Sequence, residues 1–370
     1  MDGAHISSND SRYRLVVDRK RLSISGFGIG VLIINFNTAC QTLRCLESLR
    51  KSSIEPDWVF VLDNASQSED YEILLQGCRN IEMQGLRLYK SNSNYGFAQG
   101  SNLLIDLLLE DQRCEQVVLL NNDAVACKEM LRMLADALKH GGKNVGLAGG
   151  RMHRLAAPEQ VDTLGISIYM SLMPADRKVL EDLYVGPTGG CCIFSRDLLA
   201  RLKNVYGYYF DSRFFCYCED TDLALRAILV GYRAVYIDQI IAYHEGQASS
   251  GGGSNQFIAY HGLRNTLWMH VKLMPSKILL KYGVFLILAH LMTVVRYVLS
   301  GRWRLVWRVY RDAFKCFPEY LAERKNLRAL FIENGDFLAS RLTARFYRKG
   351  YFHQMLASNW GGRKEKSGFK

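Results

Sequence analysis

The stretch Val31-Leu-Ile-Ile-Asn-Phe-Asn37 decides the fold. Its first four residues form a continuous apolar run, which is typical of a parallel strand buried on both faces. The polar residues Asn35 and Asn37 end that strand, and a helical pattern follows with Leu43 and Leu46 on its inner side. The sequence therefore predicts a strand, a polar turn and a helix, which is the repeating unit of an α/β sheet.

The same unit recurs through the first half of the chain. Apolar runs predict further strands at residues 59–62, 86–89, 117–120 and 145–150. Strands that alternate with helices imply a mostly parallel sheet flanked by helices, and ligands bind beyond the C-terminal ends of such strands. Polar side chains follow the predicted strands at that edge: Asn35, Asn37, Asp63, Asn64 and Asp123. We therefore expect the functional site there. The glycines at 26–30 precede a strand instead of following one, which argues against a dinucleotide-binding turn.

The second half of the chain has a weaker pattern. Residues 151–185 indicate a loop-rich insertion with a hairpin around residues 166–172. A strand at 191–194, a helix from Arg196 and a short strand at 234–237 follow, and His244 comes just after the last of these. The glycine- and serine-rich residues 249–254 predict a mobile loop. Helical sequence then begins near residue 260 and continues to the end.

One acidic stretch stands out, Phe215-Cys-Tyr-Cys-Glu-Asp-Thr-Asp-Leu-Ala-Leu-Arg226. Glu219, Asp220 and Asp222 fall at the start of a helical pattern. Acidic residues in a first turn are favoured by the helix dipole, which is a purely structural reason for their presence. A carboxylate at the mouth of a helix can also act as a general base. The stretch alone leaves both interpretations open.

Asp123 and His244 form the second candidate for chemistry. Asp123 closes a predicted strand, and a carboxylate together with an imidazole can hold Mg²⁺ or Mn²⁺ when a diphosphate supplies further oxygens. Taken singly, such an Asp usually caps a turn and such a His is usually hydrogen-bonded. Only Asp123 is acidic in Asn121-Asn-Asp123, and no acidic residue follows closely. We therefore expect a weak metal site that a bound diphosphate would complete.

Taken in order, these motifs resemble the family 2 glycosyltransferases, in particular their rhamnosyltransferase-like branch. The resemblance covers residues 29–270 and is carried by Ile34-Asn-Phe-Asn37, Val61-Leu-Asp-Asn-Ala-Ser66, Asn94-Tyr-Gly-Phe-Ala-Gln-Gly-Ser-Asn102, Leu119-Leu-Asn-Asn-Asp123, Gly189-Gly-Cys-Cys192, Glu219-Asp-Thr-Asp-Leu-Ala-Leu-Arg226, Gly231-Tyr232, His244 and Arg264-Asn265. It implies a GT-A fold, an α/β sandwich with a helical C-terminal appendage. It also implies inverting transfer of a sugar, rhamnose in that branch, from a nucleotide-diphosphate donor.

The resemblance also implies roles for single residues. Asp220 would be the catalytic base, with Glu219 and Asp222 as neighbours that raise its proton affinity, unless Asp222 simply caps the helix. Asp63 would read a pyrimidine base, as in a dTDP- or UDP-sugar. Asp123 and His244 would hold Mg²⁺ or Mn²⁺. The remaining nucleotide and donor contacts would come from Asn35, Asn37, Asn94, Gly96, Phe97 and Asn122. The acceptor side would include Gly189, Gly190 and Cys191, the last through packing.

Charge divides the chain into a neutral body and a basic C-terminal part. Residues 271–370 hold 20 Lys and Arg against 6 Asp and Glu, whereas the whole chain has a net charge of +11. We expect a flexible leader at 1–25 without a signal peptide, a catalytic domain at 26–265 and a basic helical region at 266–370. No nucleic-acid-binding motif accompanies the charge, so an anionic membrane surface is the favoured partner.

Two segments of that region bear on membrane contact. Residues 282–295 carry no charge but are too few to span a bilayer, for which roughly 20 are needed. Residues 302–311 alternate aromatic and cationic side chains, which is typical of a helix lying on a membrane. Packing of these helices on the catalytic domain is the alternative. We expect a cytoplasmic protein, peripheral on the inner face of the membrane, with a saccharide or lipid-linked saccharide as acceptor.

Two other functions remain open. A catalytically silent sugar-nucleotide-binding subunit of a polysaccharide assembly complex would explain the single acid in Asn121-Asn-Asp123, but Asp220 and His244 argue against it. A nucleotidyltransferase would need a glycine- and lysine-rich phosphate loop after the first strand, and none follows Ile34. The ten cysteines show no CxxC pair, so we expect reduced thiols.

Overall fold

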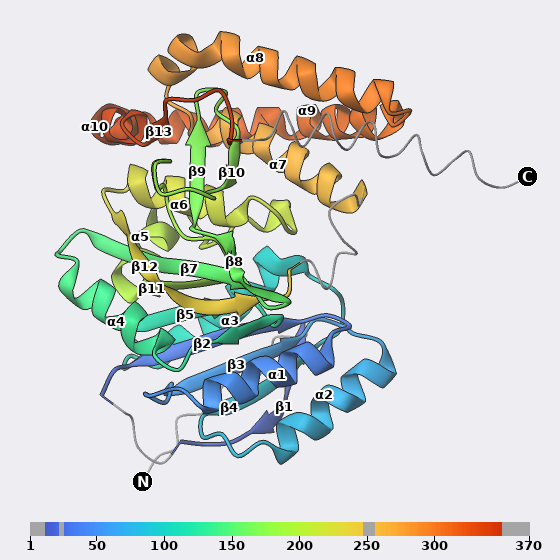
Figure 1. The fold of residues 1–370 in the computed structure, drawn as a ribbon, viewed down its shortest axis with the longest axis vertical. Helices are drawn as coiled ribbons and strands as arrows, with labels where there is room; N and C mark the ends of the chain where they lie inside the picture. Colours follow the sequence, from blue (N-terminus) through green and yellow to red (C-terminus); the bar gives the residue numbers. More distant parts are fainter. Residues whose placement is uncertain (1–11, 22–25, 247–255, 350–370) are drawn as a thin grey trace, which may run out of the picture.

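The computed structural model describes residues 12–21, 26–246 and 256–349, so the predicted mobile loop at 249–254 lies outside the described residues. An α/β body carries a layer of helices at one end (Figure 1). The strands of its main sheet are β1 (Tyr13–Asp18), β2 (Ile29–Asn35), β3 (Trp58–Asp63), β4 (Leu86–Ser91), β5 (Gln116–Leu120), β6 (Ala124–Ala126), β7 (Val145–Arg154), β8 (Ala157–Thr163), β11 (Cys191–Ser195) and β12 (Arg233–His244).

The main sheet is mixed with a parallel centre, which confirms the predicted fold class. Its order is β1-β4-β3-β2-β5-β11-β7-β12-β6, and β8 pairs with β7. Strands β4, β3, β2 and β5 run parallel, whereas β11 is antiparallel to both of its neighbours. Asn35 at the end of β2 lies beside Asp63 at the end of β3. The polar strand ends therefore meet at one edge, as the sequence predicts.

The apolar run in β2 is continuous because both faces of the sheet are covered. Val31 and Ile33 lie in one core with α1, α2 and α4, whereas Leu32 lies in the other core with α3, α5 and α6. The helices of the body are α1 (Ala39–Arg50), α2 (Ser68–Asn80), α3 (Gly96–Leu109), α4 (Met130–His140), α5 (Arg196–Tyr206) and α6 (Glu219–Leu229), with a short 3₁₀ helix at Ser212–Phe214. All ten cysteines are free.

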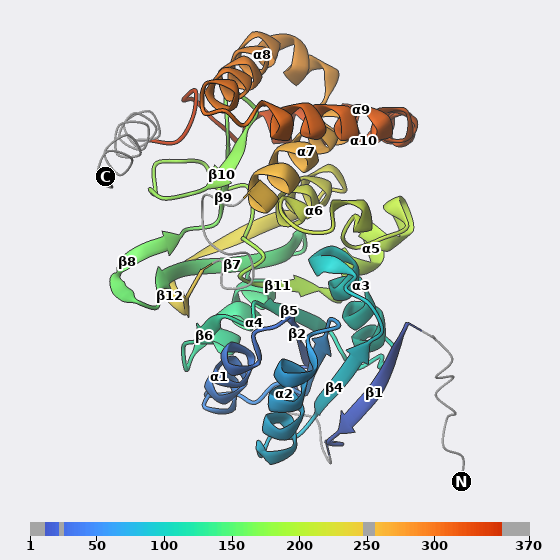
Figure 2. The ribbon, with the colours of Figure 1, turned by 90° about the vertical axis from the view of Figure 1, so that its right-hand side faces the viewer.

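The C-terminal layer consists of four helices and a small sheet. The helices are α7 (Gln256–Leu273), α8 (Ser276–Leu299), α9 (Trp303–Asn326) and α10 (Arg328–Ala339). The small sheet joins β9 (Ile166–Tyr169), β10 (Pro174–Asp176) and β13 (Leu342–Thr343), so the end of the described chain pairs with the insertion. Helix α8 is outermost, and the second view shows it above α9 (Figures 1 and 2). The predicted hairpin near 166–172 is the pair of β9 and β10.

Several predicted boundaries differ from the observed ones. The prediction of an unstructured leader is wrong for β1, which pairs with β4 at the edge of the sheet. The strand predicted at 234–237 continues to His244, because β7 pairs with it along its length. The boundary expected between residues 265 and 266 falls inside α7. The uncharged residues 282–295 are part of α8, which has 24 residues and is by length and composition able to cross a bilayer.

Candidate active site

A pocket of about 380 Å³ opens beyond the C-terminal ends of β2 and β5. It collects side chains from both halves of the chain. Ten of the predicted site residues line it: Asn94, Gly96, Phe97, Asn122, Asp123, Gly189, Gly190, Glu219, Asp220 and His244. Five predicted site residues do not line it: Asn35, Asn37, Asp63, Cys191 and Asp222.

Asp220 heads α6 and points at the glycine loop across the pocket. Its Oδ2 accepts a hydrogen bond of 2.9 Å from the Gly189 backbone N–H, and its Oδ1 accepts one of 2.6 Å from the Thr221 N–H. Burial raises the pKa of Asp220, although these two hydrogen bonds oppose the rise. A carboxylate with a raised pKa that is held in place at a pocket has the properties of a general base.

Glu219 lines the same pocket and is buried beside Asp220. Burial, followed by the neighbouring Asp220 carboxylate, raises the pKa of Glu219 well above its usual range. Its Oε2 has no hydrogen-bond partner among the described residues. The raised pKa favours the protonated form of Glu219, which can donate a hydrogen bond.

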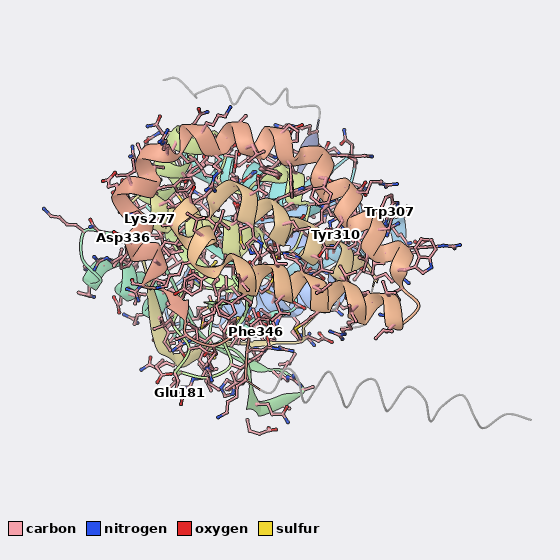
Figure 3. All side chains as sticks on the ribbon, turned by 90° about the horizontal axis from the view of Figure 1, so that it is seen from above. Glu181, Lys277, Trp307, Tyr310, Asp336 and Phe346 are labelled. Atoms are coloured by element: carbon pink, nitrogen blue, oxygen red, sulfur yellow. The ribbon has the colours of Figure 1, made fainter. Side chains whose placement is uncertain are left out.

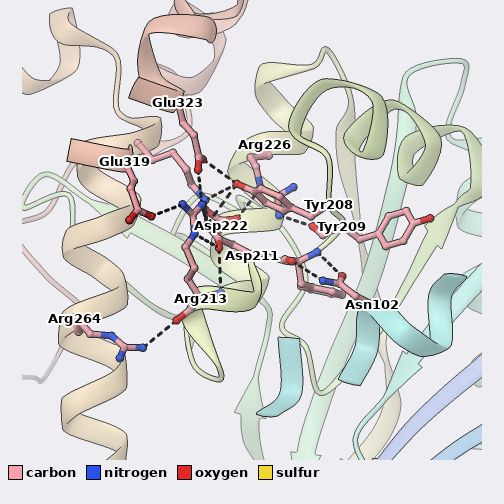
Figure 4. A network of polar contacts seen from close by, with 12 residues as sticks. Asn102, Tyr208, Tyr209, Asp211, Arg213, Asp222, Arg226, Arg264, Glu319 and Glu323 are labelled. Atoms are coloured by element: carbon pink, nitrogen blue, oxygen red, sulfur yellow. Dashed lines mark hydrogen bonds and ion pairs between the residues drawn. The ribbon is translucent and has the colours of Figure 1, made fainter. Parts of the chain in front are cut away.

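Asp222 turns away from the pocket into a buried ionic network (Figure 4). Its Oδ2 lies 2.6 Å from Arg226 Nε, and its Oδ1 lies 2.6 Å from Lys272 Nζ in α7. Lys272 also contacts Asp211 at 2.8 Å, and Arg213 links Asp211 to Glu323 of α9. Asp222 is thus neither a helix cap nor a pocket residue. It joins the α6 helix, which carries Asp220, to the C-terminal layer.

The loop that leads into α6 is strained. Phe215, Tyr217 and Cys218 have φ angles of 65°, 69° and 67°, in the left-handed region that non-glycine residues rarely occupy. The Asn265 Nδ2 atom holds this loop, since it lies 2.8 Å from the Cys216 carbonyl oxygen and 2.7 Å from that of Tyr217. Such strain persists only where surrounding contacts determine the backbone, and it concentrates at functional sites.

Gly96 allows the strained loop to pack against the start of α3. Its φ is +72°, and a Cβ atom there would lie 2.5 Å from the Phe215 ring and 2.6 Å from the Phe215 carbonyl oxygen. The Phe215 carbonyl oxygen in turn accepts a hydrogen bond from the Ala98 N–H at 3.1 Å. Close approach of two backbone segments requires glycine at this position.

We predict that Gly96→Ala lowers the free energy of unfolding by about 2–4 kcal/mol, from the left-handed backbone and the overlap with Phe215. Chemical denaturation would measure the change. Gly262→Ala is the matched control, because a Cβ there meets no atom within 4 Å. In the middle of α7 that substitution should stabilise the protein by about 0.5–1 kcal/mol. Equal stabilities of the two variants would contradict the packing described for Gly96.

His244 lies between two carboxylates at the other side of the pocket. Its Nε2 is 3.0 Å from Asp123 Oδ1, and its Nδ1 is 2.8 Å from Asp162 Oδ2. Burial disfavours the imidazolium, but the hydrogen bonds to Asp123 and Asp162 outweigh it and raise the pKa of His244 to about 10. Asp162 lies on β8. An acidic residue that is distant from Asp123 in the sequence therefore takes part in the predicted metal site.

This arrangement fits a divalent cation held jointly with a ligand. Asp123 Oδ1 and His244 Nε2 lie 3.0 Å apart, and the Asp162 carboxylate fixes the orientation of the ring from behind, as carboxylates often do for metal-binding histidines. Within the described ranges, no group of three or more His, Cys, Asp or Glu side chains is placed to hold a metal ion. Further ligands for Mg²⁺ or Mn²⁺ would have to be water and diphosphate oxygens.

The residues predicted for the nucleotide end form an internal scaffold. Asn35 Nδ2 donates to Asp63 Oδ1 at 3.1 Å, and both side chains are fully buried. Asn37 has φ 55° and accepts a hydrogen bond from the Gln67 N–H at 2.8 Å, which fixes the turn. Asn122 lines the pocket, although its Nδ2 donates to Thr38 Oγ1 at 2.6 Å. These residues therefore shape the turns around the pocket.

The acceptor side contains the two predicted glycines but not the cysteine. A Cβ on Gly190 would lie 3.1 Å from Met152 Cε, so this turn passes close beneath the pocket wall. Cys191 is buried in the core beneath the sheet, with its Sγ 3.3 Å from Met130 Sδ. Burial raises its thiol pKa far above the usual range. Cys191 therefore packs beneath the site, as the sequence favours, and has no contact with the pocket.

Other pocket residues have no counterpart in the prediction. The most informative are Asp162 and Asp176, which belong to the insertion at 151–185, and Phe257 at the start of α7. Asn64 also lines the pocket, and its Nδ2 donates to Asn94 Oδ1 at 3.0 Å. Asn64 follows Asp63 at a strand end and was expected at this edge of the sheet, but no role was assigned to it. The insertion shows no periodic pattern, so nothing in the sequence indicated the two aspartates.

The mixed sheet, its flanking helices and a pocket at the strand ends define a GT-A fold with an added C-terminal helical layer. Residues 30–203 match the model of the family described as Glycosyl transferase family 2. This part of the chain is thus similar to that family, in agreement with the motifs. No curated protein is significantly similar to the chain in sequence.

Three solved structures illustrate the similarity in fold. The mannosyltransferase PcManGT from Pyrobaculum calidifontis, in complex with GDP-Man and Mn²⁺, is 16% identical, with a TM-score of 0.48 and coverage of 83% of this chain and 86% of that chain. S. aureus TarS 1-349 in complex with UDP-GlcNAc is 17% identical, with a TM-score of 0.49 and coverage of 83% of this chain and 92% of that chain. GalNAc-T7 with UDP, GalNAc and Mn²⁺ is 13% identical, with a TM-score of 0.50 and coverage of 80% of this chain and 56% of that chain. The last of these likenesses shows a shared fold.

Proposed function

We propose that the protein is an inverting glycosyltransferase that moves a sugar from a nucleotide-diphosphate donor to a saccharide or lipid-linked saccharide acceptor. One observation carries the proposal. A single pocket holds a positioned carboxylate with a raised pKa, Asp220, together with the converging pair Asp123 and His244. The family 2 match over residues 30–203 supports the same reaction class.

The chemistry assigns one step to Asp220. The acceptor hydroxyl oxygen attacks the anomeric carbon of the donor sugar, and Asp220 takes the proton of that hydroxyl. The bond between the anomeric carbon and the diphosphate oxygen breaks, and its electron pair leaves with the nucleoside diphosphate. Attack from the face opposite the leaving group inverts the anomeric configuration. The Gly189 N–H keeps the carboxylate oriented during this step.

Asp123 and His244 would hold Mg²⁺ or Mn²⁺ against the diphosphate. A divalent cation at that point supplies neutralisation of the charge that develops on the leaving group. Asp162 would keep the Nδ1–H of His244 engaged, so that Nε2 could bind the cation once the cation displaces its proton.

The motifs favour rhamnose as the sugar and a dTDP- or UDP-linked donor. Bacterial surface polysaccharide synthesis is the process that such a transfer would serve. The acceptor would be presented on a lipid, with the protein attached peripherally to the inner face of the membrane. The basic, aromatic-rich C-terminal layer supports this location.

We predict that one donor from a panel of UDP-, dTDP- and GDP-sugars will release nucleoside diphosphate. EDTA should lower the rate of this release at least about 100-fold, because metal stabilisation of a leaving group contributes several kcal/mol. Added Mn²⁺ or Mg²⁺ should restore the rate. Asp123→Asn should raise the metal concentration needed for half-maximal rate. Metal binding can also be followed without turnover, through Mn²⁺ electron paramagnetic resonance in the presence of the nucleoside diphosphate. Full activity in EDTA would overturn the metal assignment.

A catalytically silent sugar-nucleotide-binding subunit is the second candidate. The single acid in Asn121-Asn-Asp123 is the observation that favours it. In that case calorimetry would detect binding of nucleoside diphosphates, yet no donor would be consumed in the presence of any acceptor extract. The intact Asp220 contact with the glycine loop argues for the enzyme.

A further inference from the structure

Helix α8 exposes a stripe of apolar side chains to solvent. The apolar stripe consists of Leu280, Val284, Ile287, Leu291, Val295 and Val298. Their spacing of three or four residues places them on one face of the helix. Leu280, Val284 and Ile287 are 86%, 75% and 70% exposed. The opposite face is apolar as well, with Ile278 and Ala289 buried. A helix that is apolar all round, with one face bare, indicates a missing apolar partner.

The stripe continues into a groove between α8 and α9. This groove has a volume of about 670 Å³ and is lined by apolar side chains that include Ile287, Leu291, Trp307 and Phe314. Figure 3 looks onto this end of the molecule, where α8 and α9 lie side by side and Trp307 projects outward. Trp307 is 65% exposed. The apolar surface is therefore broader than one helix.

Cationic residues flank the apolar stripe in the sequence. Between residues 276 and 311 the chain has seven Lys and Arg and no Asp or Glu. Lys277 and Lys281 flank one end of the stripe, and Arg302 and Arg304 flank the other. Trp303 is 54% exposed beside Arg304. Apolar residues bordered by tryptophan and by cations are typical of a helix that lies in the interface of an anionic membrane.

We infer that the α8–α9 surface docks on an anionic phospholipid bilayer, with the apolar stripe inserted among the lipid chains and the flanking cations at the headgroups. A second copy of the chain fits this surface less well, because it would bring seven like charges of each copy together. The geometry also disfavours a membrane crossing by α8. Its C-terminus turns back into α9 within three residues, and arginines occupy the first turns of α9.

Docking would bring the active site to a lipid-linked acceptor, and only this purpose rests on the proposed function. Vesicle binding needs neither donor nor acceptor, so its failure and the failure of the transferase proposal are distinguishable. The full chain should sediment with phosphatidylglycerol-containing vesicles and much less with phosphatidylcholine alone. The fluorescence of its exposed tryptophans should shift to the blue on binding.

Two variants test the surface. Ile287→Glu combined with Leu291→Glu should weaken vesicle binding at least about tenfold, since two apolar side chains are lost from the interface. Arg302→Gln combined with Arg304→Gln should weaken it about fivefold for each cation. Ile73→Glu on α2, where Ile73 is 46% exposed, is the matched control and should bind like the wild type. Thermal unfolding should be unchanged in all of them.

Four results would overturn the inference. Equal binding to neutral and anionic vesicles would exclude the role of the cations. Unchanged vesicle binding by the Ile287→Glu, Leu291→Glu variant would exclude the stripe. A dimer in solution that the same variant dissociates, without vesicle binding by the wild type, would assign the surface to a second copy. Retention of the protein in vesicles after alkaline carbonate washing would indicate a crossing helix instead.

Discussion

Replacing Asp220 with asparagine is expected to lower kcat by about 100- to 10,000-fold, the usual contribution of a general base. Asparagine has nearly the same shape and keeps one oxygen to accept the Gly189 N–H, so the pocket should persist. It cannot take the proton of the acceptor hydroxyl. The Kd of the donor nucleotide should therefore change little. Single-turnover nucleoside diphosphate release, together with calorimetric nucleotide binding, would separate the two effects.

Glu219→Gln is the matched control for Asp220→Asn. Burial and the Asp220 carboxylate raise the pKa of Glu219 well above its usual range, which favours the protonated form, and glutamine mimics that neutral form. The rate should stay within about tenfold of wild type, the scale of one neutral hydrogen bond. A larger loss in Glu219→Gln than in Asp220→Asn would transfer the role of base from Asp220 to Glu219.

The pH dependence follows from the same assignment. Burial raises the pKa of Asp220, so the carboxylate that accepts the proton is lost at a higher pH than for an ordinary aspartate, whose pKa is about 3.9. Activity should fall as pH decreases through that raised pKa. The acidic limb should keep its position in Glu219→Gln, since glutamine mimics the protonated form that the raised pKa of Glu219 favours. An acidic limb at the ordinary aspartate pKa would contradict the burial of the base.

The fold was largely predictable because its signals are local. The apolar run of β2 is continuous since both of its faces are covered, and the polar residues at its end meet those of β3 through parallel pairing. The signal that placed Asp220 at the start of a helix was local as well. Asp63 and Asn35 were predicted at the right edge, but their mutual hydrogen bond keeps them out of the pocket. That distinction depends on side-chain direction, which sequence patterns do not contain.

The unpredicted parts of the site depend on contacts between distant segments. Asp162 reaches His244 only because β8 pairs with β7 and β7 pairs with β12, and no periodic pattern announces β8. Asp222 and Arg226 stand four residues apart in a helix, which permits an ion pair. Lys272, the second partner of Asp222, lies in α7, so the buried network could not be predicted from the acidic stretch. Breaking this network is expected to cause a large loss of stability.

Replacing Lys272 with methionine is expected to lower the free energy of unfolding by about 3–5 kcal/mol, the cost of breaking a buried ion pair. The Lys272 side chain is fully buried and its Nζ touches both Asp222 and Asp211, so methionine leaves two buried carboxylates with less compensation. Urea denaturation would show a lower midpoint. Lys203→Met is the control, because Lys203 and Asp106 are 45% and 53% exposed and the loss should stay below about 1 kcal/mol.

The pH dependence of this effect provides a second test. Burial opposes the charge of Asp211, but Lys272 and Arg213 outweigh it and lower the pKa of Asp211. A lowered pKa stabilises the fold above the unfolded-state value of about 3.9, and this contribution is lost as pH falls further. The stabilities of wild type and Lys272→Met should therefore converge below about pH 4. A gap that persisted in acid would indicate that lost packing, and not lost charge, causes the effect. The same network makes truncation at residue 271 a poor test of membrane docking, since it removes Lys272 together with α8.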